Sequence, residues 1–172
     1  MKCITLANGM EAQVDDADVE LVSRYRWSTV RARTGLTAYA RARAPIGDAD
    51  LPGGSFVYMH RLIMGARPNE SVDHVNGNGL DNRRANLRLA SASQNAANRR
   101  KPRSARTSQF KGVHLDRGQG RKHWHARLKM NGTVYLCKRF ATEEEAARAY
   151  DEMAERVHGA FARTNSNKGR QK

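Results

Sequence analysis

Apolar and polar residues near the N-terminus predict two pairs of short strands. Cys3–Leu6 and Glu11–Val14 flank Asn8–Gly9, whose residues tolerate positive φ and therefore favour a tight hairpin turn. Residues 27–32 and 36–43 form the second predicted pair, also around a glycine-containing turn. These segments predict a small, β-rich N-terminal region.

Helices and a loop complete this half of the chain. Asp15 or Asp16 is placed to cap a short helix that runs through Val22. Residues 44–55 are rich in Pro and Gly and predict a loop, whereas the compact apolar segment Val57–Met64 predicts a helix.

The C-terminal part predicts three strands followed by one helix. The strands are expected at 110–115, 124–130 and 134–140. Thr142 and Glu145 have the spacing of a capping box, and the apolar positions that follow it recur at helical spacing as far as Gly159, a suitable C-terminal residue. The pattern predicts an antiparallel sheet packed on a single helix.

The alternation within these strands predicts which face is buried. Trp124, Ala126 and Leu128 share one parity, and the basic residues between them share the other. A two-residue Asn131–Gly132 turn would mix the two faces, so we expect a three-residue loop that pairs Arg127 with Tyr135. That register puts Val134, Leu136 and Phe140 in the core, together with Lys138, which would have to extend past the helix edge.

Segments with no apolar periodicity divide and end the chain. Residues 99–109 can bury little and predict a basic linker, ordered on DNA, and the polar tail from Asn165 is expected to fray. We therefore expect a domain at 1–98, a linker at 99–109, a second domain at 110–165 and a tail at 166–172.

The charge is concentrated in one stretch of the chain. The 172 residues carry a formal net charge of +14, of which +12 falls within residues 99–142. This excess favours a polyanionic partner, nucleic acid before an anionic membrane, over a solvated basic surface. We predict double-stranded DNA as the partner and a chain that acts as a monomer. RNA is a weaker alternative, because a sheet reader suits B-form DNA and no aromatic pair of the kind that stacks RNA bases is visible.

Several classes of protein have no signature in the sequence. No apolar run is long enough to span a membrane, and no secretory signal is visible, so we expect a cytoplasmic protein of a bacterial or phage-infected cell, without membrane association. Cys3 and Cys137 are far apart and no CxxC is present, so neither a cysteine-based zinc site nor a disulfide framework is expected.

The segment from residue 72 to 95 has the residue types of a metal-assisted hydrolase. Asp73 and the amide oxygen of Asn95 are hard oxygen ligands of the kind that Mg²⁺ prefers, and His74 can act as a base near neutral pH. Neighbouring residues of a strand point to opposite faces, so Asp73 and His74 can serve one phosphate only if the strand end bends. The alternative is a local surface pair beside a turn.

Spaced motifs across residues 55–98 resemble the HNH nucleases of phage and intron homing endonucleases. They are Met59–Leu62, Asp73–His74, Asn76–Gly77, Asp81–Arg83, Asn86–Arg88 and Gln94–Asn95. The resemblance implies a ββα-metal fold at 55–98, with residues 1–54 as a β-rich supporting extension. It also implies that His74 is the general base, that Asp73 and Asn95 bind Mg²⁺ or Mn²⁺, and that Asn86 holds the loop.

The same resemblance implies contacts with DNA near the cut. Arg61, Arg83, Arg84 and Arg88 are then candidates for phosphate contacts. His60 lies beside apolar residues and is interpreted as a half-buried, hydrogen-bonded support of the site rather than a ligand. The zinc-stapled branch of the family is excluded because its cysteine pairs are absent, and no small-molecule cofactor is expected.

Residues 110–165 resemble the plant Apetala-two/ethylene-response-factor DNA-binding domain. The motifs are Lys111–Val113, His123–Ala126, Phe140–Glu144, Ala146–Asp151, Gly159 and Asn165. From this resemblance and from the charge pattern, the candidate DNA-binding residues are Arg99, Arg100, Lys111, His114, Arg117, His125, Arg127, Lys129, Tyr135 and Arg139.

The sequence as a whole therefore predicts an α+β protein with two parts. The N-terminal part would cut DNA by a one-metal HNH mechanism, and the C-terminal three-stranded sheet would bind a particular site. The alternative is a non-catalytic, sequence-specific DNA-binding regulator with a decayed nuclease domain.

Overall fold

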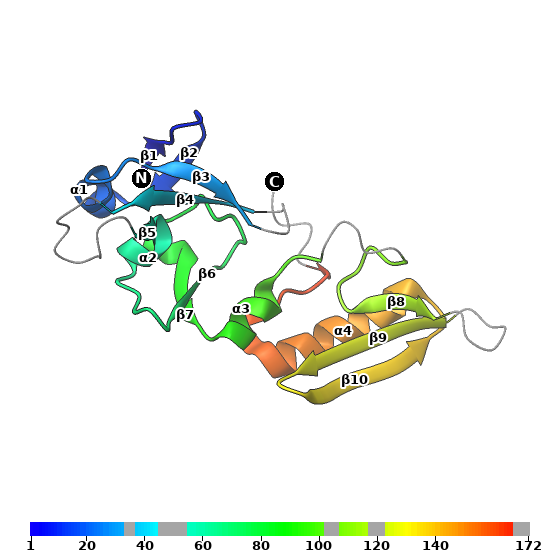
Figure 1. The fold of residues 1–172 in the computed structure, drawn as a ribbon. Helices are drawn as coiled ribbons and strands as arrows, with labels where there is room; N and C mark the ends of the chain where they lie inside the picture. Colours follow the sequence, from blue (N-terminus) through cyan, green and yellow to red (C-terminus); the bar gives the residue numbers. More distant parts are fainter. Residues whose placement is uncertain (33–36, 45–54, 102–106, 117–122, 167–172) are drawn as a thin grey trace. The chain divides into compact units, whose positions relative to one another are not determined.

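The computed structural model describes residues 1–32, 37–44, 55–101, 107–116 and 123–166. The chain divides into two compact units, Met1–Ser91 and Ala92–Lys172. All strand pairs in the described residues are antiparallel, and they form four small sheets. The mixed helix and sheet content agrees with the α+β prediction (Figure 1).

The first unit begins with the predicted hairpin, β1 (Lys2–Thr5) and β2 (Glu11–Val14). It is followed by a 3-10 turn (Asp16–Asp18) and by α1 (Val19–Ser23). Asp15 stands at the N-cap position of the 3-10 turn, but neither its side chain nor that of Asp16 makes a capping hydrogen bond. The Asp15 side chain accepts a hydrogen bond from the backbone of Arg84, and Asp16 pairs with the terminal amine of Met1.

A three-stranded sheet and a two-stranded sheet complete the first unit. The first contains β3 (Ser28–Arg31), β4 (Ala38–Arg43) and β5 (Phe56–Tyr58). The helix expected over 57–64 is shorter, because Val57 belongs to β5 and α2 covers only Met59–Ile63. The predicted turn at Thr34–Gly35, the first residue of the strand predicted at 36–43 and most of the predicted loop at 44–55 lie outside the described residues.

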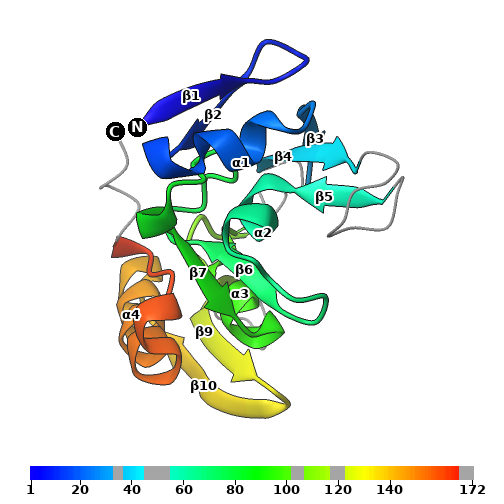
Figure 2. The same ribbon diagram turned by 90° about the vertical axis from the view of Figure 1, so that its left-hand side faces the viewer.

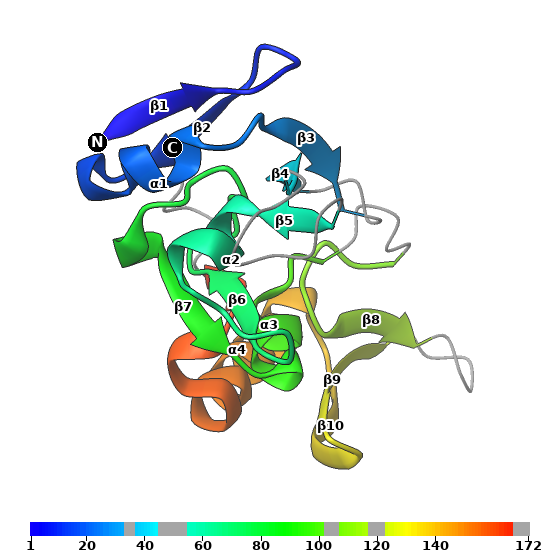
Figure 3. The same ribbon diagram turned by 60° about the vertical axis from the view of Figure 1, so that its left-hand side comes forward.

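The second sheet carries the predicted chemistry. β6 (Ser71–His74) pairs with β7 (Leu87–Ala90), so that Asp73 faces Arg88 across the ladder. A 3-10 turn (Arg84–Asn86) precedes β7. Figure 2 shows this pair of strands beside α2. One apolar core, from Leu6 to Leu87, joins the sheets and helices of the unit. Figure 3 shows α2 between β5 and β6 of this unit.

Residues of the N-terminal region contact the loop between β6 and β7. The backbone of Gln13 accepts from the Asn82 amide at 2.8 Å and donates to the Leu80 carbonyl at 2.8 Å. A Cβ atom at Gly79 would collide with the Ala38 carbonyl and the ring of Tyr39, so this close approach requires glycine. The loop is therefore fixed by residues that are distant in sequence.

The second unit begins with α3 (Ala92–Asn98) and contains the predicted sheet. The strands are β8 (Val113–Asp116), β9 (His123–Met130) and β10 (Thr133–Phe140), in the order β10-β9-β8. Helix α4 (Glu143–His158) packs on one face of this sheet (Figure 1). Its capping box between Thr142 and Glu145 and its end at Gly159 are confirmed, and a 3-10 turn (Gly159–Phe161) follows.

The predicted register of the β9–β10 hairpin is wrong. The turn is the two-residue Asn131–Gly132, with φ of 49° and 87°, and Met130 pairs with Thr133. The ladder shifts between Val134 and Leu136, so that Leu136 lies opposite Leu128. This bulge restores the buried parity that the tight turn disturbs, and it leaves Val134 and Lys138 exposed.

Two segments that the sequence described as loose are anchored. Ser108, from the predicted linker, is buried and donates to Glu143 at 2.6 Å, while Lys101 donates to the Val113 carbonyl at 3.0 Å. Asn165, expected to fray, is buried and bonded to Asp151 and to the Lys111 backbone. The unit boundary after Ser91 leaves α3 with the second unit, whereas the functional boundary at residue 98 stays a prediction.

Candidate functional site

His74 lies at the end of β6, in a buried cluster of rings. Its ring centroid is 4.9 Å from that of His60, in an edge-on arrangement, and 5.7 Å from that of Tyr39. Tyr58 also contacts His60, at 5.6 Å between ring centroids. The cluster brings together side chains from β4, β5, α2 and β6.

Burial determines the protonation state of these histidines. It lowers the pKa of His74 below its usual 6.5, although the hydrogen bond to Asn82 and the carboxylates of Asp73 and Asp81 act in the opposite direction. Burial, with His74 and Arg61 nearby, lowers the pKa of His60 to about 3. Both rings are therefore neutral at pH 7, and a neutral imidazole is the form that can accept a proton.

Asn82 selects the tautomer of His74. The Asn82 side chain donates its amide hydrogen to the Leu80 carbonyl at 3.3 Å, which turns its oxygen toward His74 Nε2, also at 3.3 Å. Nε2 must then carry the hydrogen, and the lone pair is at Nδ1. Asn82 is fully buried, so this orientation is held firmly.

Asp73 is buried next to His74 and is paired with an arginine. Its Oδ2 accepts from Arg88 Nε at 2.9 Å and from Arg88 Nη2 at 2.7 Å. A buried carboxylate needs such compensation, because an unpaired charge in the interior is costly. The pair holds the carboxylate at the strand end, beside the ring cluster.

The loop between β6 and β7 is built on asparagine and aspartate hydrogen bonds. Asn86 donates to the Asp81 carbonyl at 2.7 Å and accepts from the Asn76 amide at 3.0 Å. The Asp81 carboxylate receives the Arg83 guanidinium through two bonds of 2.7 Å, and this pairing lowers the pKa of Asp81. Asn86 thus bonds to two positions of the loop, and its role in holding the site stays a prediction.

The other arginines predicted near phosphates have protein partners. Arg84 binds the buried Asp18, with Nη2 and Oδ1 2.7 Å apart. Arg61 donates to the carbonyls of Ala66, Arg67 and Glu70, and so closes the turn after α2. Each of these guanidinium groups stabilises the first unit.

Known proteins with similar sequences show which family the chain belongs to. The HNH endonuclease family model matches residues 57–97, the span from β5 to α3. The chain is also 34% identical, over 146 residues, to an uncharacterized HNH endonuclease of Acanthamoeba polyphaga mimivirus, and the match covers 84% of this chain and 69% of that protein. The chain belongs to the HNH endonuclease family. No solved structure matches it significantly.

The family assignment supports a nuclease that acts on DNA. Within the HNH region, Asp73 and His74 are adjacent in the first unit, whereas Asn95 lies half-buried on α3, in the second unit. Within the described residues no group of three His, Cys, Asp or Glu side chains is arranged around a common cation site. A site with one carboxylate, an amide oxygen and water has the oxygen donors that Mg²⁺ takes, so the residue types fit a hard divalent ion.

The second unit of this HNH protein presents a basic surface on the side of the sheet away from α4. We call it the basic sheet face; it consists of His114, His125, Arg127, Lys129, Cys137 and Arg139. Arg127 and Lys129 are exposed and form no ion pair with a described residue. Arg139 pairs with Asp116 at 2.8 Å.

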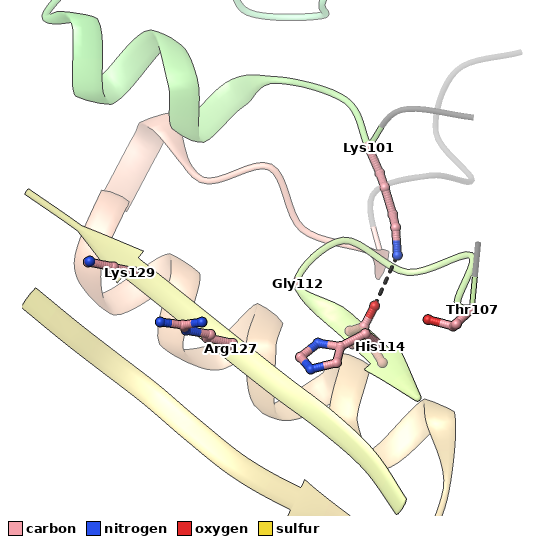
Figure 4. A pocket seen from close by; sticks show the side chains of 7 residues that line it. Lys101, Thr107, Gly112, His114, Arg127 and Lys129 are labelled. Atoms are coloured by element: carbon pink, nitrogen blue, oxygen red, sulfur yellow. Dashed lines mark hydrogen bonds between the residues drawn. The ribbon is translucent and has the colours of Figure 1, made fainter. Parts of the chain in front are cut away.

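An open pocket of about 490 Å³ lies on this face. Lys101, Thr107, His114, Arg127 and Lys129 line it, and none of its lining residues is acidic (Figure 4). Figure 4 shows the side chains of Arg127 and Lys129 on β9 and that of His114 on β8. Such a pocket suits an anionic group such as a phosphate.

The remaining predicted DNA-binding residues are less uniform. Tyr135 is exposed at the bulge, and Arg99 and Arg100 are exposed after α3. Lys111 instead points to the Ala97 carbonyl, and burial, with Arg163 nearby, lowers its pKa to about 8. Arg117 lies outside the described residues. None of the described helices is long and apolar enough to cross a membrane.

Sequence reasoning missed several residues of the ring cluster. Tyr39, Tyr58 and Asn82 surround the two histidines, but they come from three separate segments with no common spacing. His60 was expected to be half-buried and hydrogen-bonded. It is buried, and its Nδ1 has no hydrogen-bond partner in the described part of the chain, which corrects that interpretation.

Proposed function

We propose that this HNH protein is a site-specific DNA endonuclease of the homing type, which hydrolyses phosphodiester bonds with the aid of one divalent metal ion. The observation that supports it best is the neutral, buried His74, with its tautomer fixed by Asn82 and a buried carboxylate next to it. In this proposal His74 Nδ1 accepts the proton of the attacking water.

The metal would be held by Asp73 and Asn95, with Mg²⁺ or Mn²⁺ as the ion. When bound, such an ion neutralises charge that develops on the phosphate and the leaving oxygen. Residues of the chain would position the base and hold the loop around it. The ring cluster excludes solvent from His74, Asn82 fixes its lone pair, and Asn86 keeps the loop in place.

Recognition of the DNA site is assigned to the second unit. We propose that it is an Apetala-two/ethylene-response-factor-like domain, whose basic sheet face enters the major groove. Arg127 is the candidate for base contacts, and Lys129 and the pocket beside it are candidates for phosphate contacts. Support comes from the three-stranded sheet on one helix and from the net +12 charge over residues 99–142.

A cleavage assay on supercoiled plasmid tests this function. We expect nicked or linear DNA with Mg²⁺ or Mn²⁺ and none with EDTA, and sequencing of the ends cut from a randomised pool should give a defined site. Tight DNA binding without cleavage by the wild-type protein would favour a decayed nuclease that acts as a DNA-binding regulator. Cleavage without any site preference would contradict the proposed homing activity but would still support a DNA endonuclease.

A further inference from the structure

Three side chains of the basic sheet face form a chain of contacts from thiol to imidazole to imidazole. Cys137 Sγ on β10 lies 3.4 Å from His125 Nε2 on β9. The other nitrogen of the same ring, Nδ1, lies 3.0 Å from His114 Nε2 on β8. The three residues therefore come from the three strands of one sheet.

Sheet register creates this arrangement. His114 and His125 are direct partners in the β8–β9 ladder, and their rings meet edge-on at 4.7 Å between centroids. Cys137 is the direct partner of Arg127 in the β9–β10 ladder. His125 is paired with Arg139 in the neighbouring pair on the same face, so Cys137 lies diagonally across from it. The alternation of the strands thus places all three side chains on the side away from α4.

The hydrogen-bond geometry permits one coherent proton transfer. The Cys137 thiol donates to His125 Nε2, and His125 Nδ1–H donates to His114 Nε2. When the proton moves from sulfur to Nε2, the His125 imidazolium donates to the thiolate and to His114, so both of its N–H groups remain bonded. A nucleophile, a base in contact with it and a third group that orients the base are the parts of an activated thiol.

The groups around Cys137 and His125 favour a neutral His125 before the proton transfer and a thiolate on Cys137 after it. Partial burial, with His114 and Arg139 nearby, lowers the pKa of His125, which keeps its imidazole neutral and able to accept a proton at pH 7. Arg127, the ladder partner of Cys137, carries positive charge on the same face, whereas Arg139 is paired with Asp116. Cys137 is exposed to solvent, so a reagent can reach it.

We propose that Cys137 is a thiol modification site that reacts with low-molecular-weight disulfides, with His125 as its base and His114 orienting that base, and that the resulting mixed disulfide weakens DNA binding. The Cys137 thiolate attacks one sulfur of the disulfide, a new sulfur–sulfur bond forms and the old one breaks. The departing thiolate takes the proton from His125. Cys137 is oxidised to a mixed disulfide with one half of the small disulfide, and the other half is reduced and leaves as a thiol.

The effect on DNA follows from the position of Cys137. A bulky group there stands between Arg127 and Arg139, on the face that carries the pocket. This last step rests on the proposed function, because it requires that the basic sheet face binds DNA. The thiol chemistry does not require it.

Cys3 provides a matched control within the same chain. It is also exposed, it lies on β1 in the first unit, and its thiol has no hydrogen-bond partner among the described residues. Cys3→Ser leaves Cys137 as the reacting thiol, and Cys137→Ser leaves Cys3. The two variants can be compared folded and in denaturant, where both thiols should react alike.

The test measures the rate at which each folded variant reacts with the neutral probe 4,4′-dithiodipyridine at pH 7. We expect Cys137 to react about tenfold faster than Cys3, since His125 is in contact with the Cys137 thiol and can take its proton. Adding His125→Asn to the Cys3→Ser protein should reduce the rate to that of Cys3, whereas His123→Asn on the same strand should not. Equal rates for Cys137 and Cys3, or no effect of His125→Asn, would overturn the assignment.

DNA binding is then measured for the Cys3→Ser protein before and after reaction with oxidised glutathione, and again after reduction. We expect affinity to fall at least about tenfold on modification and to return on reduction. Unchanged affinity after complete modification would overturn the link to DNA. Failure of the unmodified protein to bind DNA would contradict the proposed function instead, so the two failures are distinguishable.

Discussion

The arginines around the β6–β7 loop of the first unit differ in their pairing from Arg127 on the sheet of the second unit. In the first unit Arg83, Arg84 and Arg88 each bind a buried aspartate, with nitrogen–oxygen distances of 2.7 Å. In the second unit, Arg127 stands exposed on β9 without an ion-pair partner among the described residues. The formal charge of +2 on the first unit and +12 on the second reflects the same division.

This difference shows that a count of basic residues does not measure the charge available to a ligand. An arginine already bonded to a buried carboxylate contributes to folding, and its release for a phosphate would leave that carboxylate uncompensated. The exposed basic residues of the second unit can bind a phosphate at much lower cost. We therefore expect the chemistry proposed for the first unit and the attraction to DNA proposed for the second to be separable by mutation.

The largest expected effect is the loss of cleavage when His74 is replaced. His74→Ala removes the neutral base, and we expect the cleavage rate to fall at least about 100-fold, the usual range for such a group. DNA affinity, measured by gel shift on the same protein, should stay within about twofold because the basic sheet face is untouched. Wild-type cleavage by this variant would remove His74 as the base.

The next effect concerns the most deeply placed of the paired arginines. The side chain of Arg88 is 19% exposed and its partner Asp73 is 6% exposed, whereas that of Arg84 is 55% exposed. We expect Arg88→Met to lower the free energy of unfolding by about 3 kcal/mol, because it leaves a buried carboxylate unpaired. Arg84→Met is the control and should cost less, since water can replace part of its contact. Urea unfolding of the two variants measures both losses of unfolding free energy. Equal losses would contradict the prediction that Arg88 contributes more than Arg84.

Acid should weaken the first unit through His60. Its pKa is about 3 in the folded protein, against the ordinary value of 6.5 for an unfolded chain, so the unfolded chain binds the proton first as pH falls. Stability is therefore retained above pH 6.5 and lost below it, by about 1.4 kcal/mol per pH unit. Between pH 6.5 and 5, we expect His60→Leu to lose about 2 kcal/mol less than the wild-type protein in urea titrations. Identical pH profiles would show that His60 is not held neutral by burial.

The smallest expected effect tests the exposed charges of the second unit. Arg127→Ala combined with Lys129→Ala should reduce DNA affinity about tenfold and lower the salt dependence of binding by about two released ions. Arg148→Ala with Arg156→Ala removes the same charge from exposed positions on α4 and should leave the salt dependence nearly unchanged. Equal effects of the two double variants would mean that net charge, not the basic sheet face, attracts DNA.

The sheet of the second unit shows what the sequence could and could not predict. The three strands, the capping box and the buried parity of β9 follow from local patterns, and the structure has them. The register was wrong because the intrinsic preference of Asn131–Gly132 for a two-residue turn prevailed, and a bulge after Val134 then corrected the parity. The alternation of apolar and polar residues predicts which side chains are buried. It does not predict the turn length or the position of a bulge, because different combinations of the two give the same buried face.

The ring cluster shows the other limit. The sequence predicts Asp73 and His74 as site residues because they are adjacent and lie in a motif that resembles the family. The contacts of Tyr39 and Asn82 with His74 depend on how β4 and the loop meet β6, which no local spacing encodes. The pairing of Arg84 with Asp18, 66 residues away, is of the same kind. Tertiary packing decided these positions.

The bridge between Gln13 and Asp81 has a consequence for how the protein reaches its native state. Every ladder among the described strands joins neighbours in the chain, and such pairings close short loops and form quickly. The Gln13–Asp81 bridge, by contrast, closes a loop of more than half the first unit, and it docks the segment that orients His74. On refolding of the full-length chain we therefore expect the hairpins to form before this closure, so that the contact between Asn82 and His74 is among the last features of the first unit to appear.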